Sequence, residues 1–216
     1  MYLLLEGDYA CFTMPEAKVE RMSYPFITPS SARSVISAVF WRPAIRWVVR
    51  SIKILRPISY LNFRRNELKG KISGKNPVSI EDARTQRISV ILKNVSYEVD
   101  IEPILTPKGI ADKEPLKKFT EMLKQRLKRG QHYSQPYLGC REFAAEVSLS
   151  DGQKPALDIN MDILMFYDRF YPEDAVFKKN LNDPKWKKTN NFFFQAKVKN
   201  GIVSVPSREE IMGVYA

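Results

Sequence analysis

Two amphipathic helical patterns, each lying between strand-like runs, limit most strongly the folds open to this sequence. The first begins at Thr28, whose hydroxyl can cap a helix and which a proline follows. Apolar residues then recur at the spacing of one helical face, and Pro43 is expected to end the helix. The second pattern covers about residues 114–129, with Asp112 as a candidate cap and Gly130 as the stop.

Strand-like runs surround these two helices. The runs cover residues 2–12, 50–55, 88–104 and 142–149. Residues 63–87 are polar and basic, and predict a mobile loop. The order β-α-β-β-α-β is that of the split βαβ unit. The sequence therefore predicts an α+β fold with a ferredoxin-like domain. Such a domain is also RRM-like, because RNA-recognition modules are built on the same unit.

The character of the chain changes after residue 150. The stretch SLSDGQKP is rich in turn residues and predicts a domain boundary. Residues 158–167 are typical of a strand, and Asn200-Gly201 between two apolar runs predicts a hairpin. We therefore expect a ferredoxin-like domain over residues 1–150 and a small antiparallel β-sheet domain over residues 151–216.

The chain is strongly basic, with 35 Lys and Arg residues against 24 Asp and Glu residues and a net charge of +11. The positive charge gathers in residues 42–75, 113–129 and 178–199, with aromatic residues among them. One such cluster is typical of a solvated face, but three favour a surface that follows a nucleic acid, because cations bind phosphate and rings stack on unpaired bases. A membrane surface is the weaker alternative, since neither helix sets a polybasic face opposite a broad aromatic one.

The cysteine and histidine counts exclude several kinds of site. Two cysteines and His132 are too few for a four-ligand Cys/His zinc site. Two cysteines do not make a disulfide scaffold either, so a reduced, cytoplasmic protein is the simplest interpretation. No apolar run is long enough to cross a membrane, and the first residues lack a signal-peptide pattern. We expect neither a metal nor a cofactor.

The sequence has no Walker loop, GxSxG or HExxH motif, which leaves metal-free RNA cleavage as a route open to a basic chain. In that reaction the ribose 2′-hydroxyl attacks its own phosphate. The protein then supplies a base, a positive charge for the developing phosphorane and an acid for the leaving 5′-oxygen. Lys117 and Lys118, at the start of the second helix, could carry that charge, although each is also typical of an ordinary surface lysine.

Four longer strings occur in order: GDYACFT, PEAKVERMSYPFITPSSAR, FWRPAIRW and GQHYSQPYLGCREF. Together they resemble the CRISPR-associated repeat-processing protein of the type I-C (Dvulg) system, in the RAMP superfamily, over about residues 2–206. The resemblance implies a ferredoxin-like N-terminal domain and a metal-independent endoribonuclease that cuts the repeat hairpin of precursor CRISPR RNA. It also implies products with a 2′,3′-cyclic phosphate and a 5′-hydroxyl. The protein would stay on the 5′ handle of the guide, with the other subunits of the interference complex as partners.

The resemblance carries only one of the family's catalytic residues over to this chain. The family uses a tyrosine just before a Trp/aromatic-Lys-Pro segment and a Lys-His pair at the start of the second helix. These positions fall at Phe40, Lys118 and Phe119. Neither phenylalanine can transfer a proton, and both lie on the apolar helical faces.

Three interpretations follow from this replacement. In the first, Lys118 stabilises the phosphorane while His132, Lys117 or a tyrosine such as Tyr24 transfers protons. In the second, cleavage is slow and rests on positioning of the RNA together with Lys118. In the third, the protein holds the guide RNA 5′ handle as a non-catalytic subunit.

The residues expected to contact RNA are basic and come from the first two clusters: Arg42, Arg64, Arg65, Lys69, Lys117 and Lys124. The same surface would serve a general RNA-binding module with no preference for the repeat hairpin. The sequence leaves open whether DNA is bound as well.

Overall fold

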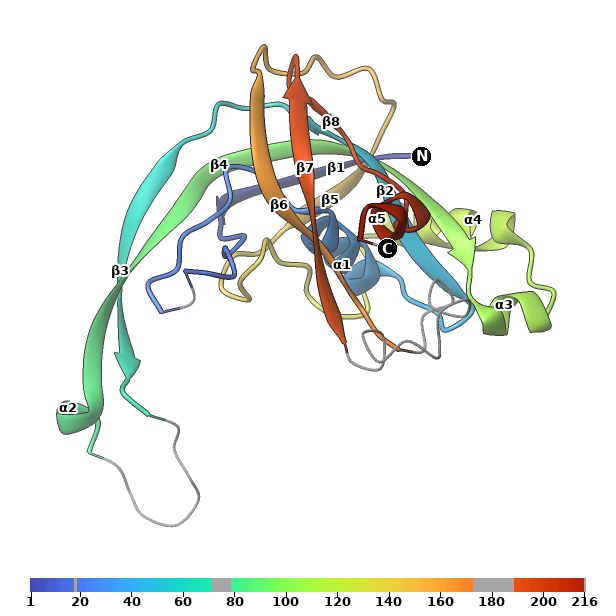
Figure 1. Cartoon of the computed structure of the whole chain (residues 1–216). Helices are drawn as coiled ribbons and strands as arrows, with labels where there is room; N and C mark the ends of the chain where they lie inside the picture. Colours follow the sequence, from blue (N-terminus) through green and yellow to red (C-terminus); the bar gives the residue numbers. More distant parts are fainter. Residues whose placement is uncertain (18, 71–78, 173–188, 216) are drawn as a thin grey trace.

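The computed structural model describes residues 1–17, 19–70, 79–172 and 189–215. In chain order the elements are β1 (Tyr2–Ala10), α1 (Pro29–Val39), β2 (Ile45–Ile54), β3 (Tyr60–Leu68), α2 (Ile80–Ala83), β4 (Arg84–Leu105), α3 (Pro107–Ala111), α4 (Leu116–Lys128), β5 (Glu146–Ser150), β6 (Met161–Phe170), β7 (Asn190–Lys199), β8 (Ile202–Ser204) and α5 (Arg208–Tyr215) (Figure 1). Within these residues, no helix is long and apolar enough to cross a membrane.

The strands form one antiparallel sheet in the order β5-β1-β4-β2-β8-β7-β6, with β3 paired to β4 outside this path. β4 is 22 residues long and pairs with three other strands in succession along its length. It pairs with β3 along residues 84–92, with β1 along 92–100 and with β2 along 97–105. The expectation of helices combined with an antiparallel sheet is therefore confirmed.

β3 and the first part of β4 form a two-stranded arm that extends away from the rest of the sheet, with α2 near its tip (Figure 1). The prediction of a loop over residues 63–87 was wrong for residues 63–68 and 84–87, which are strand, and for residues 80–83, which form α2. Residues 60–64 are all exposed, so this part of the arm has no buried face and no apolar alternation that a sequence could reveal. Residues 71–78 of that prediction lie outside the described residues.

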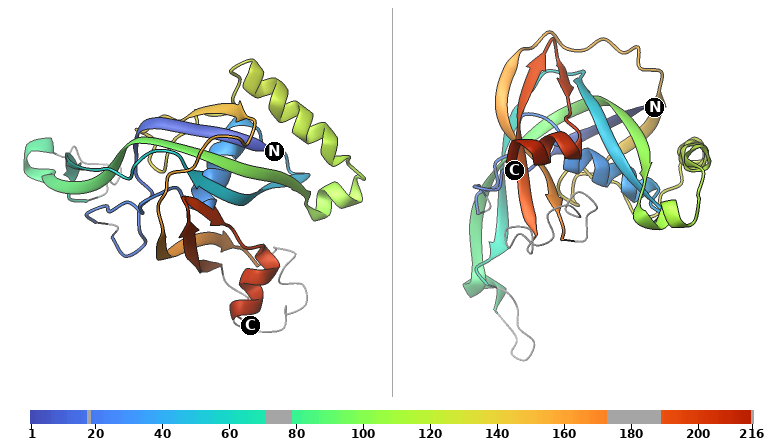
Figure 2. Two further views of the ribbon diagram at one scale, coloured as in Figure 1. Left: turned by 90° about the horizontal axis from the view of Figure 1, so that it is seen from above. Right: turned by 45° about the vertical axis from the view of Figure 1, so that its right-hand side comes forward.

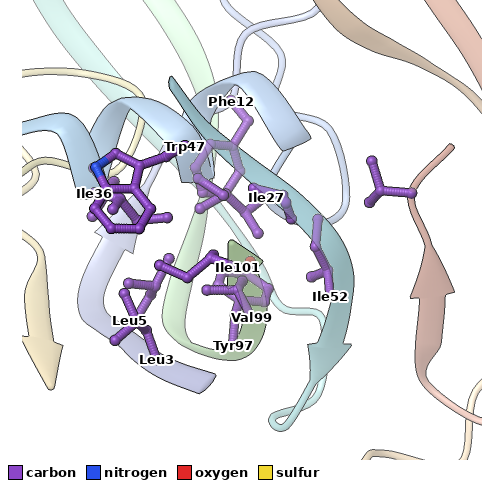
Figure 3. Close-up of a cluster of buried hydrophobic side chains, with 14 of the residues drawn as sticks. Leu3, Leu5, Phe12, Ile27, Ile36, Trp47, Ile52, Tyr97, Val99 and Ile101 are labelled. Atoms are coloured by element: carbon purple, nitrogen blue, oxygen red, sulfur yellow. The ribbon is translucent and has the colours of Figure 1, made fainter. Parts of the chain in front are cut away.

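The main core lies between the sheet and α1, as Figure 3 shows for the side chains around Ile36. Leu3 and Leu5 of β1, Ile52 of β2 and Val99 of β4 are fully buried together with Ile36. Truncating one such side chain to alanine typically costs about 2–5 kcal/mol, so this layer holds α1 firmly on the sheet.

α1 begins as predicted, because Thr28 Oγ1 accepts a hydrogen bond from Ser31 N at 3.1 Å. It ends at Val39 rather than near Pro43. Phe40 already has an extended backbone (φ −149°, ψ 117°), and its carbonyl accepts a hydrogen bond from Trp47 Nε1 at 2.8 Å.

α4 begins later than predicted, at Leu116 after Pro115. Asp112 does not cap it; instead the backbone N–H of Asp112 closes the end of α3. Gly130 ends α4 as predicted, with a φ of +62° that favours glycine. The helix packs Phe119 and Leu123 toward the sheet, and Figure 2 shows it along the edge that carries β5.

The C-terminal strands continue the same sheet. Asn200 and Gly201 form the predicted turn between β7 and β8, with φ of +48° and +72°. β8 then pairs with β2, and buried residues from both parts of the chain belong to one core. The division into domains at residues 1–150 and 151–216 stays a prediction.

Candidate functional site

The C-terminal end of α1 and the adjoining face of α4 surround Phe40. Its side chain is buried, and its ring meets Trp47 edge-on at a centroid distance of 6.4 Å. The guanidinium carbons of Arg42 and Arg126 lie 5.7 Å and 5.5 Å from the ring centroid, within cation–π range. Arg126 Nη1 also donates to Val39 O at 3.4 Å, which ties α4 to the end of α1.

Lys118 lies in the first turn of α4 with its side chain about half exposed (51%). Its Nζ donates to Glu114 Oε2 at 3.0 Å and lies 5.7 Å from the ring centroid of Phe119. Exposed i,i+4 ion pairs contribute less than about 1 kcal/mol, so a phosphate can replace Glu114 as the partner of Lys118. Phe119 is buried, and Lys117 is exposed beside Lys118.

His132 is exposed in the loop that follows α4. Tyr133 N and Ser134 N donate to Ala38 O at 2.9 Å and 3.0 Å, so this loop is fastened to the end of α1. α4 rises about 1.5 Å per residue, which puts its end at Lys128 about 15 Å from Lys118 along the axis. The structure therefore places His132 near the end of α1 that leads to Phe40, and three turns of helix from Lys118.

The residues expected to contact RNA have different surroundings. Arg42 and Arg64 are exposed. Arg65 is 17% exposed and forms an ion pair with Glu142 at 2.7 Å, which joins the arm to the loop before β5, and a second one within β3, with Glu67 at 3.1 Å. Two of the expected lysines also have partners: Lys124 Nζ pairs with Glu121 at 2.8 Å, and Lys69 Nζ donates to Asp82 O at 3.4 Å.

A buried carboxylate that no local sequence pattern marks brings together three arginines from three elements. Asp168 of β6 accepts hydrogen bonds from Arg33 Nη2 of α1 at 2.6 Å and from Arg46 Nη2 of β2 at 2.8 Å. Arg208 Nη1 of α5 lies 3.8 Å from Asp168 Oδ2. Burial would raise the pKa of Asp168, but the charges of Arg33 and Arg46, with the Arg169 N–H, outweigh it and lower the pKa.

Two functional candidates were missed for different reasons. Arg126 lies on the apolar stripe of the second helical pattern. A cation on such a stripe is unusual, and this departure from the pattern could have marked Arg126 as a candidate. The Asp168 group left no local signal, because its partners are 122 and 135 residues away in the sequence.

Cys11 and Cys140 lie together and are both free and buried. The hydrogen bond with Cys140 lowers the pKa of Cys11 to about 6, against the effect of burial, and Arg21 adds to the lowering. Arg21 Nη1 also lies 3.3 Å from Cys140 Sγ. In the described ranges, no three Cys, His, Asp or Glu side chains are placed to hold a metal ion.

Comparison with known proteins agrees with the resemblance seen in the sequence. A family model described as CRISPR-associated protein (Cas_Cas5) matches residues 1–206. A curated relative from Thermus thermophilus, named CRISPR pre-crRNA endoribonuclease Cas5d, is 40% identical over 209 residues, which are 94% of this chain and 90% of the relative. A relative of the same name from Mannheimia succiniciproducens is 40% identical over 215 residues, 93% of this chain and 92% of the relative.

Two solved structures share the fold. One, described as a CRISPR-associated protein, has a TM-score of 0.68 and 18% identity and covers 97% of this chain and 92% of its own. The other, a functionally uncharacterized protein from Streptococcus mutans, has a TM-score of 0.67 and 20% identity, with coverage of 97% and 93%.

The fold and these matches define a CRISPR-associated protein. Since the family model and both curated relatives cover more than nine-tenths of the chain, the assignment can be made more closely. The chain belongs to the Cas5d family.

Proposed function

We propose that this protein is a metal-independent endoribonuclease that cuts precursor CRISPR RNA at the repeat hairpin and then stays on the 5′ handle of the product. The observation that carries the proposal is the 40% identity, over more than nine-tenths of the chain, to two proteins named as CRISPR pre-crRNA endoribonucleases. The net charge of +11 and the exposed basic residues suit an RNA substrate.

In the proposed reaction, the 2′-hydroxyl of the RNA attacks the adjacent phosphate and the 5′-oxygen leaves, which yields a 2′,3′-cyclic phosphate and a 5′-hydroxyl. Lys118 Nζ would stabilise the phosphorane, because it is half exposed and its ion pair with Glu114 is an exposed i,i+4 pair that a phosphate can replace. Lys117 is a second cation on the same turn. His132 would transfer protons only if the RNA spans the length of α4, since three helical turns separate it from Lys118.

We infer the finer features of the family in the same way. The order β5-β1-β4-β2, with α1 and α4 as crossovers, supports a ferredoxin-like split βαβ arrangement. We propose that residues 1–150 form this domain and that residues 151–216 form a small β-rich part. We also propose that the protein works in the reducing cytoplasm, which suits two free cysteines. There it would belong to a type I-C effector complex, with the other subunits of that complex as its partners.

A second candidate function is a subunit that binds the guide 5′ handle without cutting. The observation that favours it concerns Phe40 and Phe119, which stand where the family resemblance places a tyrosine and a histidine. Both side chains are buried and neither can titrate. Lys118 alone cannot move both protons of the reaction.

A cleavage assay separates the two functions. The cognate repeat hairpin RNA is incubated in EDTA with wild type, Lys118→Ala and His132→Ala, and binding is measured on the same RNA. We expect wild type to cut and Lys118→Ala to lose about 10²–10³-fold in rate, as for the loss of one transition-state donor, with binding changed little. Tight binding by wild type without cutting would support the guide-binding subunit instead. The His132→Ala rate shows whether His132 transfers a proton.

A further inference from the structure

The side of α4 that faces the sheet carries one cation. Arg126 follows Phe119 and Leu123 on this side, and its side chain is half-buried. An arginine that is partly removed from water is usually paired with a carboxylate, because desolvation of the charge costs free energy. Among the residues that the structure describes, no carboxylate pairs with Arg126. Its guanidinium instead donates to Val39 O at 3.4 Å and lies 5.5 Å from the centroid of the Phe40 ring.

Arg42 brings a second guanidinium to the same ring, from the loop between α1 and β2. Its Cζ lies 5.7 Å from the centroid of the Phe40 ring, and its side chain is exposed. Arg42 likewise forms no ion pair with any carboxylate in the described ranges. Two positive charges beside one neutral ring repel each other, and an anion that binds both removes this repulsion.

The geometry of Arg126 suits a phosphate in particular. A guanidinium has five N–H donors, of which the bond to Val39 O uses one, and it binds phosphate through two parallel hydrogen bonds. The contacts with Val39 and with the Phe40 ring hold the guanidinium in place beforehand. Little side-chain entropy is therefore lost when an anion binds.

The remainder of α4 favours a strand of RNA over an acidic protein segment. The helix contains five basic residues and one acidic residue. Arg126 follows Lys118 by eight residues, which is about 12 Å along the axis. Phosphates repeat along a nucleic acid strand at shorter and regular intervals, about 3.4 Å of axial rise in a duplex. A strand that follows α4 thus brings one phosphate to Lys118 and a different one to Arg126.

We propose that Arg42 and Arg126 together bind one backbone phosphate of the RNA, at a different position from the phosphate that Lys118 contacts. The inference rests on the proposed function and adds a substrate-positioning site to it. The site lies at the end of α1, where the loop that carries His132 is fastened through Ala38 O. A phosphate bound there holds the strand along α4, between Lys118 and this loop.

Repeat RNAs that each carry one methylphosphonate, an uncharged replacement for a phosphate, test this pair of arginines. Each RNA has a 2′-deoxyribose at that position so that it is not cut, and the reference RNA has the 2′-deoxyribose alone. Affinity for the full chain is measured by fluorescence anisotropy. In wild type, the neutral group at the bound position should weaken binding about 10- to 100-fold, as for the loss of hydrogen bonds to a charged group.

The variants identify which side chains contact that phosphate. Arg42→Gln and Arg126→Gln should each reduce the methylphosphonate penalty at one shared position, and the double variant should abolish it. Lys118→Ala should reduce the penalty at a different position. Because a purely structural role of Arg126 would weaken binding at every position alike, the dependence on position separates the two roles.

Lys128→Gln is the matched control, because it removes an exposed positive charge from the same helix, two residues after Arg126. It should keep the full penalty at the shared position. Thermal unfolding of each variant shows whether α4 stays on α1 without the bond to Val39 O. If Arg126→Gln does not fold, Arg42→Gln decides the question, since Arg42 is exposed in a loop.

The proposal would be overturned if no position showed a reduced penalty in both arginine variants. It would also be overturned if the shared position were the one that Lys118→Ala affects. The endoribonuclease proposal would still stand in either case, because wild type would still bind and cut the repeat RNA. Failure of wild type to bind that RNA at all would overturn both proposals.

Discussion

Under the proposed function, Phe40 and Phe119 limit the chemistry at the positions where the family resemblance places a tyrosine and a histidine, because a phenyl ring can neither accept nor donate a proton. Both rings are buried, yet each has cations close to it. Arg42 and Arg126 lie over the Phe40 ring, and Lys118 lies over the Phe119 ring. Positive charge suited to the proposed phosphorane is thus present beside both rings, while the rings themselves cannot move a proton.

Restoring those groups should accelerate cleavage. In Phe40→Tyr the hydroxyl would lie near Arg42 and Arg126, whose charges lower the pKa of a phenol. Phe119→His would place an imidazole beside Lys118. We expect the double variant to cut the repeat RNA about 10²-fold faster than wild type, at the low end for general acid–base catalysis. Single-turnover rates across pH measure this, and the profile should gain a limb near the histidine pKa of about 6.5.

The control for this prediction is Lys118→Ala in the double-variant background, which should abolish the gain. Thermal unfolding is needed alongside, because both substitutions put a polar group into a buried position. An unchanged rate in a folded double variant would mean that proton transfer at these positions does not limit cleavage.

The elements of the fold are tied together by the Asp168 group, which links α1, β2, β6 and α5 through one carboxylate. The side chain of Asp168 is 8% exposed, whereas those of Arg33 and Arg46 are 27% and 23% exposed. Removing one partner of a buried pair leaves the other charges uncompensated, which typically costs more than the pair contributed.

Asp168→Asn should therefore lower the free energy of unfolding at pH 7 by about 3 kcal/mol, at the low end for a buried pair because the arginines are partly exposed. The folded pKa of Asp168 is lowered, so its contribution is present above the unfolded pKa of about 3.9 and is lost as the pH falls through the folded value. Urea unfolding at pH 7 and at pH 2–3 measures both effects. The variant should lose less stability on acidification than wild type; a parallel loss in both would contradict the prediction.

At the scale of the whole molecule, the excess of positive charge is divided between structural pairs and exposed side chains. Arg64 and Arg65 are neighbours in β3 with opposite roles. Arg64 is exposed, while Arg65 pairs with Glu67 and Glu142 and fastens the arm to the body. The net charge alone therefore overstates the number of basic side chains that are available to bind phosphate.

This difference predicts opposite phenotypes for two adjacent substitutions. Arg64→Gln should lower the slope of log K against log salt by about one unit and leave the thermal stability unchanged. Arg65→Gln should leave that slope nearly unchanged and destabilise the protein by up to about 1 kcal/mol, since it removes the ion pair to the half-exposed Glu142, while Glu67 keeps Arg87 as a partner. Fluorescence anisotropy at several salt concentrations and thermal unfolding measure the two effects. If both substitutions changed the slope equally, Arg65 would have to break its ion pairs with Glu67 and Glu142 and bind the RNA instead.

Features that rest on neighbouring residues could be predicted from the sequence alone. Thr28 caps α1, Gly130 ends α4 and Asn200-Gly201 turns β7 into β8, because capping and turn chemistry act over a few residues. Lys118 could likewise be placed at the start of a helix, and the long motif strings led to the Cas5d family.

Features that join distant segments could be known only from the folded structure. Residues 60–64 of the β3–β4 arm are all exposed, so the pairing of this part of β3 leaves no apolar period in the sequence. The continuation of the sheet from β2 to β8 joins residues as far apart as Ser51 and Ser204, which are 153 positions apart. The convergence of three arginines on Asp168 likewise depends on contacts between distant segments. A local pattern cannot encode such contacts, because their free energy exists only once the chain has folded and brought the partners together.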